Sequence, residues 1–175
     1  SFDIYSVNVH TGAKRLIGRS YRTAPKWSVN GKWAVMYDPI AQVWNKFDGA
    51  TGKVVNISDA IGYPMFMESY DKPAPAPAYG IAGWTADGNN VFLYDAYDWW
   101  KIDLTGERQP ECLTKGYGRK HGKSIRKMTS NIDKDVFQKD EKVIVSLWDK
   151  DTMDEGVYQL DMKGRLRKLM EGNYV

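Results

Sequence analysis

The chain repeats a sequence pattern with a spacing of roughly 50 residues, and this repeat restricts the possible folds more than any other feature. A full copy has a Trp, a turn ending in Asn-Gly or Asp-Gly, a strand ending in Tyr-Asp, a strand with an aromatic residue and Asp, and a Thr-Gly turn (Lys-Gly in the weaker copy) before a last strand. Two full copies cover 27–57 and 84–113, and a weaker copy covers 140–169. Residues 2–12 match only the second half of the pattern. We therefore expect the chain to start inside a repeat.

Within each copy, apolar and polar residues alternate as they do in short β-strands. Tyr5, Val7 and Val9 share one face of the first predicted strand, and the dipeptides Asn30-Gly31 and Asp87-Gly88 suit hairpin turns. Repeats of this length with four strands are typical of β-propeller blades. We predict an all-β chain: one domain over residues 1–175, a partial β-propeller of about three to four four-stranded antiparallel blades.

Closed propellers usually have about four to eight blades, so the repeat count favours a fragment of a larger propeller. An incomplete array leaves blade faces and strand edges open, and these favour self-association.

Several aromatic residues recur at matching positions of the pattern, among them Trp27, Trp84 and Tyr94. A residue that repeats with the blade is expected in the core between blades. Trp99 and Trp100 are adjacent, so one must point away from the other on a strand. One of this pair is therefore a candidate for stacking on a carbohydrate or peptide.

Three segments carry a resemblance to a known family: "YGIAGWTADGNNVFLYDAYDWWKID", "CLTKGYGRKHG" and "SLWDKDTMDEGVYQLD". They resemble the N-terminal propeller of bacterial prolyl oligopeptidase family serine peptidases, especially the large dipeptidyl-peptidase-like members common in Bacteroidetes. The likeness runs through essentially the whole chain. It implies that an α/β-hydrolase domain with a Ser-Asp-His triad follows in the parent protein. This chain would then be the non-catalytic part that caps the active site and restricts access of the peptide substrate. Export, for example to the periplasm, is implied by the same resemblance.

No catalytic residue is predicted in the chain itself. It contains no Gly-x-Ser-x-Gly segment and only two histidines, His10 and His121, so no triad can be assembled from its sequence. Cys112 is the only cysteine and is expected to be a small buried residue. We predict no cofactor.

Acidic residues in the last copy raise two possibilities. The segment 149–160 lacks the Gly and Glu that an EF-hand loop needs at its sixth and twelfth positions, so it is interpreted as a polar hairpin loop, with no metal. Paired acidic residues in dipeptidyl-peptidase-type propellers often hold a substrate's ammonium group. By that resemblance, Asp154 and Glu155 are candidates for peptide binding.

Two connections between repeats remain. Residues 65–78, with Tyr70 and alternating prolines, predict a stiff crossover that borders a functional surface. Residues 115–127 are basic and are interpreted as a solvated inter-blade connection or a surface for the hydrolase domain. The small net charge of +3 argues against a nucleic-acid or membrane-surface partner. The alternative function is a stand-alone TolB-like propeller module that binds a peptide, protein or glycan.

Overall fold

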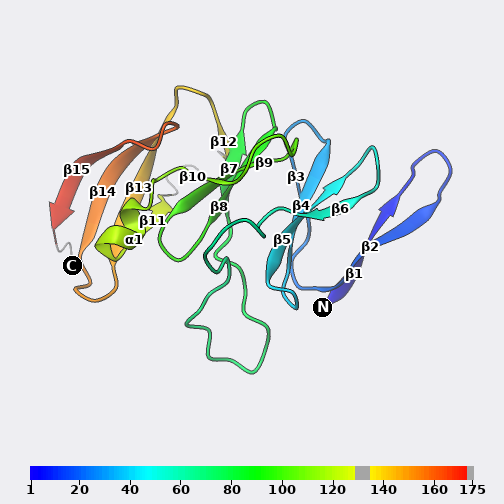
Figure 1. Ribbon diagram of the computed structural model, residues 1–175, viewed down its shortest axis with the longest axis horizontal. Coiled ribbons are helices and arrows are strands. Elements are labelled where there is room, and N and C mark those ends of the chain that lie inside the picture. The colour runs from blue at the N-terminus through cyan, green and yellow to red at the C-terminus, as the bar shows by residue number, and fades with distance from the viewer. Residues whose placement is uncertain (129–134, 173–175) are drawn as a thin grey trace.

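A computed structural model describes residues 1–128 and 135–172, and it consists of β-sheets arranged side by side from one end of the chain to the other (Figure 1). A two-stranded hairpin comes first and three larger sheets follow it, so the chain forms a partial β-propeller. The hairpin consists of β1 (Phe2–Val7) and β2 (Lys14–Tyr21).

Three blades follow the hairpin. Blade 1 consists of β3 (Lys26–Trp27), β4 (Trp33–Asp38), β5 (Val43–Asp48) and β6 (Val54–Asn56). Blade 2 consists of β7 (Ile81–Thr85), β8 (Asn90–Tyr94), β9 (Trp99–Asp103) and β10 (Glu111–Cys112). Blade 3 consists of β11 (Lys123–Lys127), β13 (Lys142–Asp149), β14 (Glu155–Asp161) and β15 (Leu166–Gly172). Neighbouring strands of each blade pair antiparallel, as the repeat predicts.

The hairpin turns form where the sequence places them. Gly31 and Gly88 both adopt φ of +70°, a left-handed conformation that glycine tolerates without steric cost. The two turns also touch, because the Asn30 side chain donates a hydrogen bond to the Asp87 carbonyl at 2.9 Å. The same turn in successive blades therefore helps to hold the blades together.

Alternating side chains on each middle strand pack against different neighbours. On β4, Val35 and Tyr37 face blade 2, whereas Ala34 and Met36 face the β1–β2 hairpin. A second apolar cluster joins blades 2 and 3, with Trp99 fully buried in it. The core is therefore divided into layers between successive sheets, as in a propeller.

Trp27 departs from the prediction that the recurring aromatics are core residues. Trp84 and Tyr94 are buried, but Trp27 is 55% exposed. It faces the hairpin side, where the buried cluster draws on β1, β2, β4 and β5 but not on β3. Within the part of the chain that the structure describes, its ring contacts one aromatic side chain, Phe47, at 6.4 Å between centroids and edge to face. The prediction was wrong here because the two-stranded hairpin leaves β3 uncovered.

The face shared by Tyr5, Val7 and Val9 is also exposed. Ile4 points the other way and is buried, and shifts in strand register flank it.

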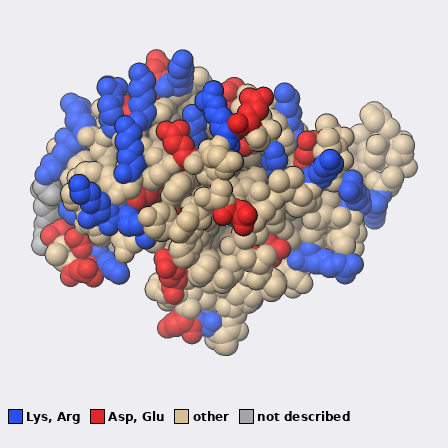
Figure 2. Space-filling model, in the orientation of Figure 1, with Lys and Arg blue, Asp and Glu red and all other residues tan. Residues whose placement is uncertain are grey.

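The basic segment 115–127 is only partly a connection. Its first half contains a one-turn helix, α1 (Tyr117–His121). Its second half is β11, the first strand of blade 3, so the interpretation of the whole segment as a connection was wrong. No helix among the described residues has the length and apolarity needed to cross a membrane. Figure 2, in the orientation of Figure 1, shows Lys and Arg side chains gathered over the blade 3 side of the molecule.

One strand has no counterpart in the repeat. β12 (Val136–Phe137) lies in the β11–β13 connection and pairs with β7, the first strand of blade 2. This pairing is parallel and extends blade 2 to five strands.

Candidate functional site

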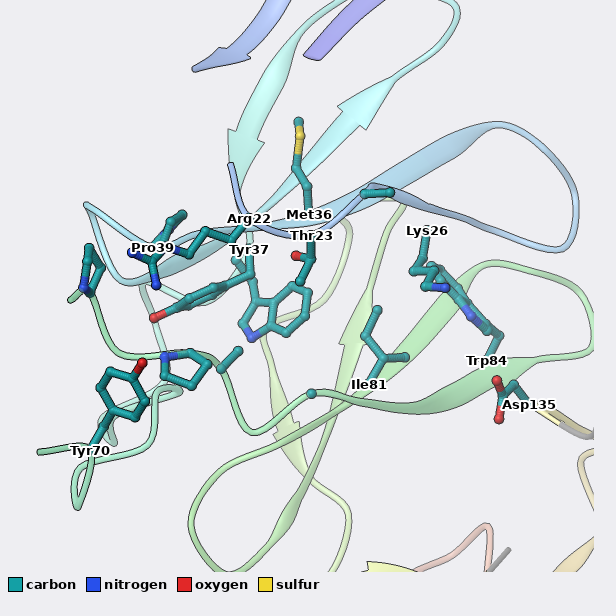
Figure 3. Close-up of a pocket in the computed structure, with 16 residues that line it drawn as sticks. Arg22, Thr23, Lys26, Met36, Tyr37, Pro39, Tyr70, Ile81, Trp84 and Asp135 are labelled. Carbon is teal, nitrogen blue, oxygen red and sulfur yellow. The ribbon is translucent and has the colours of Figure 1, made fainter. Parts of the chain in front are cut away.

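An apolar cleft of about 350 Å³ lies between blades 1 and 2 (Figure 3). Strands β4, β5 and β7 contribute its floor, and the 65–80 connection contributes one wall. In Figure 3, Tyr70 and Tyr37 lie toward one end, Ile81 lies in the middle, and Trp84 and Asp135 lie toward the other end. The volume falls in the range of small-ligand sites, which are about 300 to 1,000 Å³ and mostly apolar.

The connection that walls the cleft is a long hairpin-like excursion from the body of the sheets (Figure 1). Its base is closed by a bridge between Phe66 and Ala78 and by a hydrogen bond from the Met67 amide to the Pro77 carbonyl at 2.8 Å. Tyr70, Pro75 and Pro77 all line the cleft. The connection therefore borders the opening of this cleft.

Tyr37 ties this wall to blade 1. Its hydroxyl donates a hydrogen bond to the Ala76 carbonyl at 3.1 Å. Burial raises the pKa of Tyr37 to about 12, and the charge of Asp38 adds to the rise. The hydroxyl therefore remains a protonated donor at physiological pH, and it fixes the loop over the cleft.

Trp44 lies beside Tyr37, with ring centroids 5.4 Å apart. Its indole Nε1–H is buried and has no hydrogen-bond partner among the described residues. Trp99 occupies the same place in blade 2, because Tyr94 pairs with Trp99 as Tyr37 pairs with Trp44. Yet the Trp99 Nε1–H donates to the Ile125 carbonyl at 3.1 Å. Equivalent indoles are thus satisfied in one blade and unsatisfied at the cleft.

The charged groups at the cleft are mainly positive. Arg22 and Lys26 line it. Among the described residues, Asp135 is the one acidic side chain that lines it. Asp135 is already paired with Lys127, a residue of β11. An acidic group on a ligand would therefore complement this cleft.

The sequence did not point to Arg22, Lys26 or Trp44 as site residues. Trp44 recurs with the pattern, as Trp99 does, and recurrence by itself indicates a core residue. The two cations sit in ordinary polar surroundings along the chain. The site arises because the two blades and the long connection meet there.

The two adjacent tryptophans of β9 point in opposite directions, as predicted. Trp99 is fully buried against Phe92, Tyr94 and Phe137, so it belongs to the core. Trp100 is half-buried and remains the candidate stacking residue of the pair. It lines a separate hollow of about 380 Å³, and its ring lies 6.2 Å from that of Tyr63.

Arg119 lines this second hollow and contacts several of its other residues. Its guanidinium lies 3.8 Å from the centre of the Tyr63 ring and forms a 3.0 Å ion pair with Asp95. The Asp95 carboxylate also accepts a hydrogen bond from Trp100 Nε1 at 3.1 Å. Burial of Arg119 lowers the pKa of its guanidinium, but the hydrogen bond to Asp95 and the nearby acidic groups together outweigh burial, so the pKa is raised.

A second buried carboxylate and a second arginine complete this structural cluster. Asp98 accepts hydrogen bonds from the Thr114 hydroxyl at 2.6 Å and from the Gly118 amide at 2.9 Å. Arg126 donates to the Asp95 carbonyl at 2.7 Å, and burial lowers the pKa of its guanidinium. Arg119 and Arg126 are therefore not solvated charges, contrary to the expectation for segment 115–127. They hold the loops between blades 2 and 3.

Asp154 and Glu155 lie in blade 3, where the β13–β14 loop enters β14. The Asp154 carbonyl accepts a hydrogen bond from the Asp149 amide at 2.9 Å, as expected for a hairpin loop. The structure thus places this pair on a different blade from Trp100 and the Tyr70 cleft. The candidate residues do not form one site.

Cys112 is half-buried and ends β10, just before the connection from blade 2 to blade 3. Burial raises the pKa of its thiol, and its sulfur accepts a hydrogen bond from the Gly116 amide at 3.2 Å. A reactive cysteine requires a lowered pKa, so these surroundings fit a structural residue.

Comparison with known proteins gives a structural likeness only. No family model and no curated protein matches the chain. Among solved structures, TolB from Acinetobacter baumannii aligns with 98% of this chain at 14% identity and a TM-score of 0.43. The chain spans about half the length of that structure, covering 49% of it.

Proposed function

We propose that this chain is the non-catalytic propeller part of a prolyl oligopeptidase family serine peptidase and that it restricts which peptides reach the catalytic site. The observation that carries the proposal is the apolar cleft between blades 1 and 2, walled by the proline-containing connection. The sequence resemblance described above supports the peptidase assignment. The cleft supports contact with peptide side chains, because apolar walls with a few polar groups are typical of such sites.

In this proposal the hydrolytic step belongs to an α/β-hydrolase domain of the parent protein, which is also the main partner of the chain. Tyr70 borders the peptide path, and Trp100 offers a stacking surface near the second hollow. Asp154 and Glu155 are proposed to attract the ammonium group of a peptide, on the basis of charge complementarity.

The second candidate is a stand-alone TolB-like binding module. It is favoured by the fact that both walls of the cleft come from this chain, so a ligand could bind without a catalytic domain. Its ligand would be a peptide, a protein segment or a glycan.

An aminoacyl-proline reporter peptide distinguishes the two functions. The 175-residue chain should not hydrolyse it, whereas the complete gene product should, in a reaction blocked by a serine-directed inhibitor. The coding sequence beyond Val175 should then contain Gly-x-Ser-x-Gly followed by Asp and His. Inhibitor-sensitive hydrolysis by this chain alone, or a stop codon after Val175, would contradict the peptidase proposal.

A further inference from the structure

The edge of blade 2 formed by β7 is already paired with a short strand from a later part of the same chain, β12. β12 runs parallel to β7, with Val136 opposite Trp84. The Trp84 amide donates to the Asp135 carbonyl at 2.7 Å, and the Ala86 amide donates to the Phe137 carbonyl at 3.0 Å. This is strand addition to an open sheet edge, within one chain.

Phe137 anchors the added strand. Its side chain is buried, with its ring 6.2 Å from Trp99 and 5.8 Å from Phe92. Gly83 makes room for it, because a Cβ at that position would lie 2.5 Å from the Phe137 ring. The anchor therefore sits over the residue of β7 that precedes Trp84.

Blade 1 has the same edge without an added strand among the described residues. β3 is the terminal strand of its sheet, and Trp27 pairs with Ala34 as Trp84 pairs with Val91. The Ser28 amide donates to the Trp33 carbonyl across the sheet at 2.8 Å. Since donors alternate along a strand, the Trp27 amide points to the open edge, as the Trp84 amide does toward β12.

The place in blade 1 that corresponds to the position of the Phe137 side chain in blade 2 lies at the apolar cleft. Lys26 precedes Trp27 as Gly83 precedes Trp84, and its side chain lines the cleft. Trp44, the counterpart of Trp99, lines it too and has the unsatisfied Nε1–H. Lys26 carries the Cβ that Gly83 lacks, so a ring cannot lie over the Lys26 backbone as Phe137 lies over Gly83. The ring would instead enter the cleft beside the Lys26 side chain, an arrangement that allows a cation–π contact.

We propose that blade 1 binds an extended peptide, which adds to the open edge of β3 in parallel and inserts an aromatic side chain into the apolar cleft. The peptide carries an acidic residue two positions before the aromatic one, as Asp135 precedes Phe137. Arg22 and Lys26 at the cleft favour that charge. The main-chain bonds supply affinity and the cleft supplies selectivity. This inference is independent of the peptidase proposal, because its assay requires no hydrolytic activity.

The probe is the fluorescein-labelled peptide acetyl-Asp-Val-Phe-Gln-Lys-amide, which copies residues 135–139. Fluorescence anisotropy with the 175-residue chain should show saturable binding, with Kd on the order of 100 μM for so short a strand. A peptide with Ser in place of Phe should bind at least about tenfold more weakly, since the anchor supplies more than about 1.4 kcal/mol.

Two variants at one position separate strand addition from general surface binding. Trp27→Pro removes the edge-facing donor and no bond to β4, whereas Trp27→Ala removes only a side chain on the opposite face of the sheet. Trp27→Pro should weaken binding about tenfold or more, and Trp27→Ala should leave it within about twofold. Circular dichroism and thermal melting verify that both variants fold.

Amide chemical-shift mapping supplies the independent readout. Shifts on titration should concentrate at 26–29 and around the cleft. Equal weakening by the two variants, no saturable binding, or shifts centred on 84–86 instead would each overturn the proposal.

Discussion

Trp44 and Trp99 occupy equivalent positions but should respond differently to replacement by Phe. Both are buried, so each substitution loses apolar contact and leaves a small cavity, at a cost of about 1 to 2 kcal/mol. Trp99→Phe also deletes the hydrogen bond to the Ile125 carbonyl, which adds about 1 kcal/mol. Ile125 is not left unsatisfied, because Arg126 Nη1 donates to the same carbonyl at 2.8 Å.

Trp44→Phe instead removes a buried donor that has no partner, which returns about 1 to 3 kcal/mol of desolvation cost. The two effects nearly cancel, so the free energy of unfolding should change by less than about 1 kcal/mol. The variants should therefore differ by about 2 to 4 kcal/mol, with Trp99→Phe the less stable.

Urea unfolding followed by far-ultraviolet circular dichroism measures the difference, since that signal comes mainly from the backbone of the sheets and each variant has its own baselines. The midpoint should fall clearly for Trp99→Phe and little for Trp44→Phe, at unchanged slope. Equal losses in the two variants would refute the claim that the cleft leaves the Trp44 donor unsatisfied.

Three further predictions concern the sheet edges and turns. Gly83→Val should displace Phe137 and release β12, which hydrogen exchange would detect as faster exchange of the Trp84 and Ala86 amides; unchanged protection would contradict the role given to Gly83. The Thr85 hydroxyl and the Asn89 amide lower the pKa of Asp87 from its ordinary 3.8, so its contribution to stability is present above that value and lost as pH falls through the lower folded value. Asp87→Asn should therefore destabilise the chain at pH 7, and the loss should shrink as the pH falls below 3.8; a loss that does not depend on pH would count against this. We also propose that the exposed β1 face promotes self-association, which light scattering should show as concentration-dependent and reduced by Tyr5→Lys; a concentration-independent monomer would argue against it.

The repeat in the sequence predicted most of the strands, because each blade specifies its own turns and its own alternation. Asn30-Gly31 and Asp87-Gly88 form the expected turns, and the strands around them begin and end close to the predicted residues. These features depend on interactions that are local in the chain.

The features that the sequence did not predict depend on contacts between distant segments. β12 is two residues long and gains its place from Gly83, which lies about one repeat earlier. Trp27 matches the pattern of a core residue, yet its exposure depends on what covers β3. The cleft was anticipated only through its proline-containing wall, since its floor comes from strands of two blades that lie far apart in the sequence.

The most direct test of the central functional claim compares peptides of increasing length as substrates of the complete gene product. Residues 68–76, which form the tip of the cleft wall, are replaced by Gly-Gly, while the Phe66–Ala78 bridge is kept. If the chain restricts access, kcat/KM for long peptides should rise by about tenfold relative to wild type, and kcat/KM for a dipeptidyl reporter should stay the same. Unchanged length selectivity in a folded variant would contradict the account.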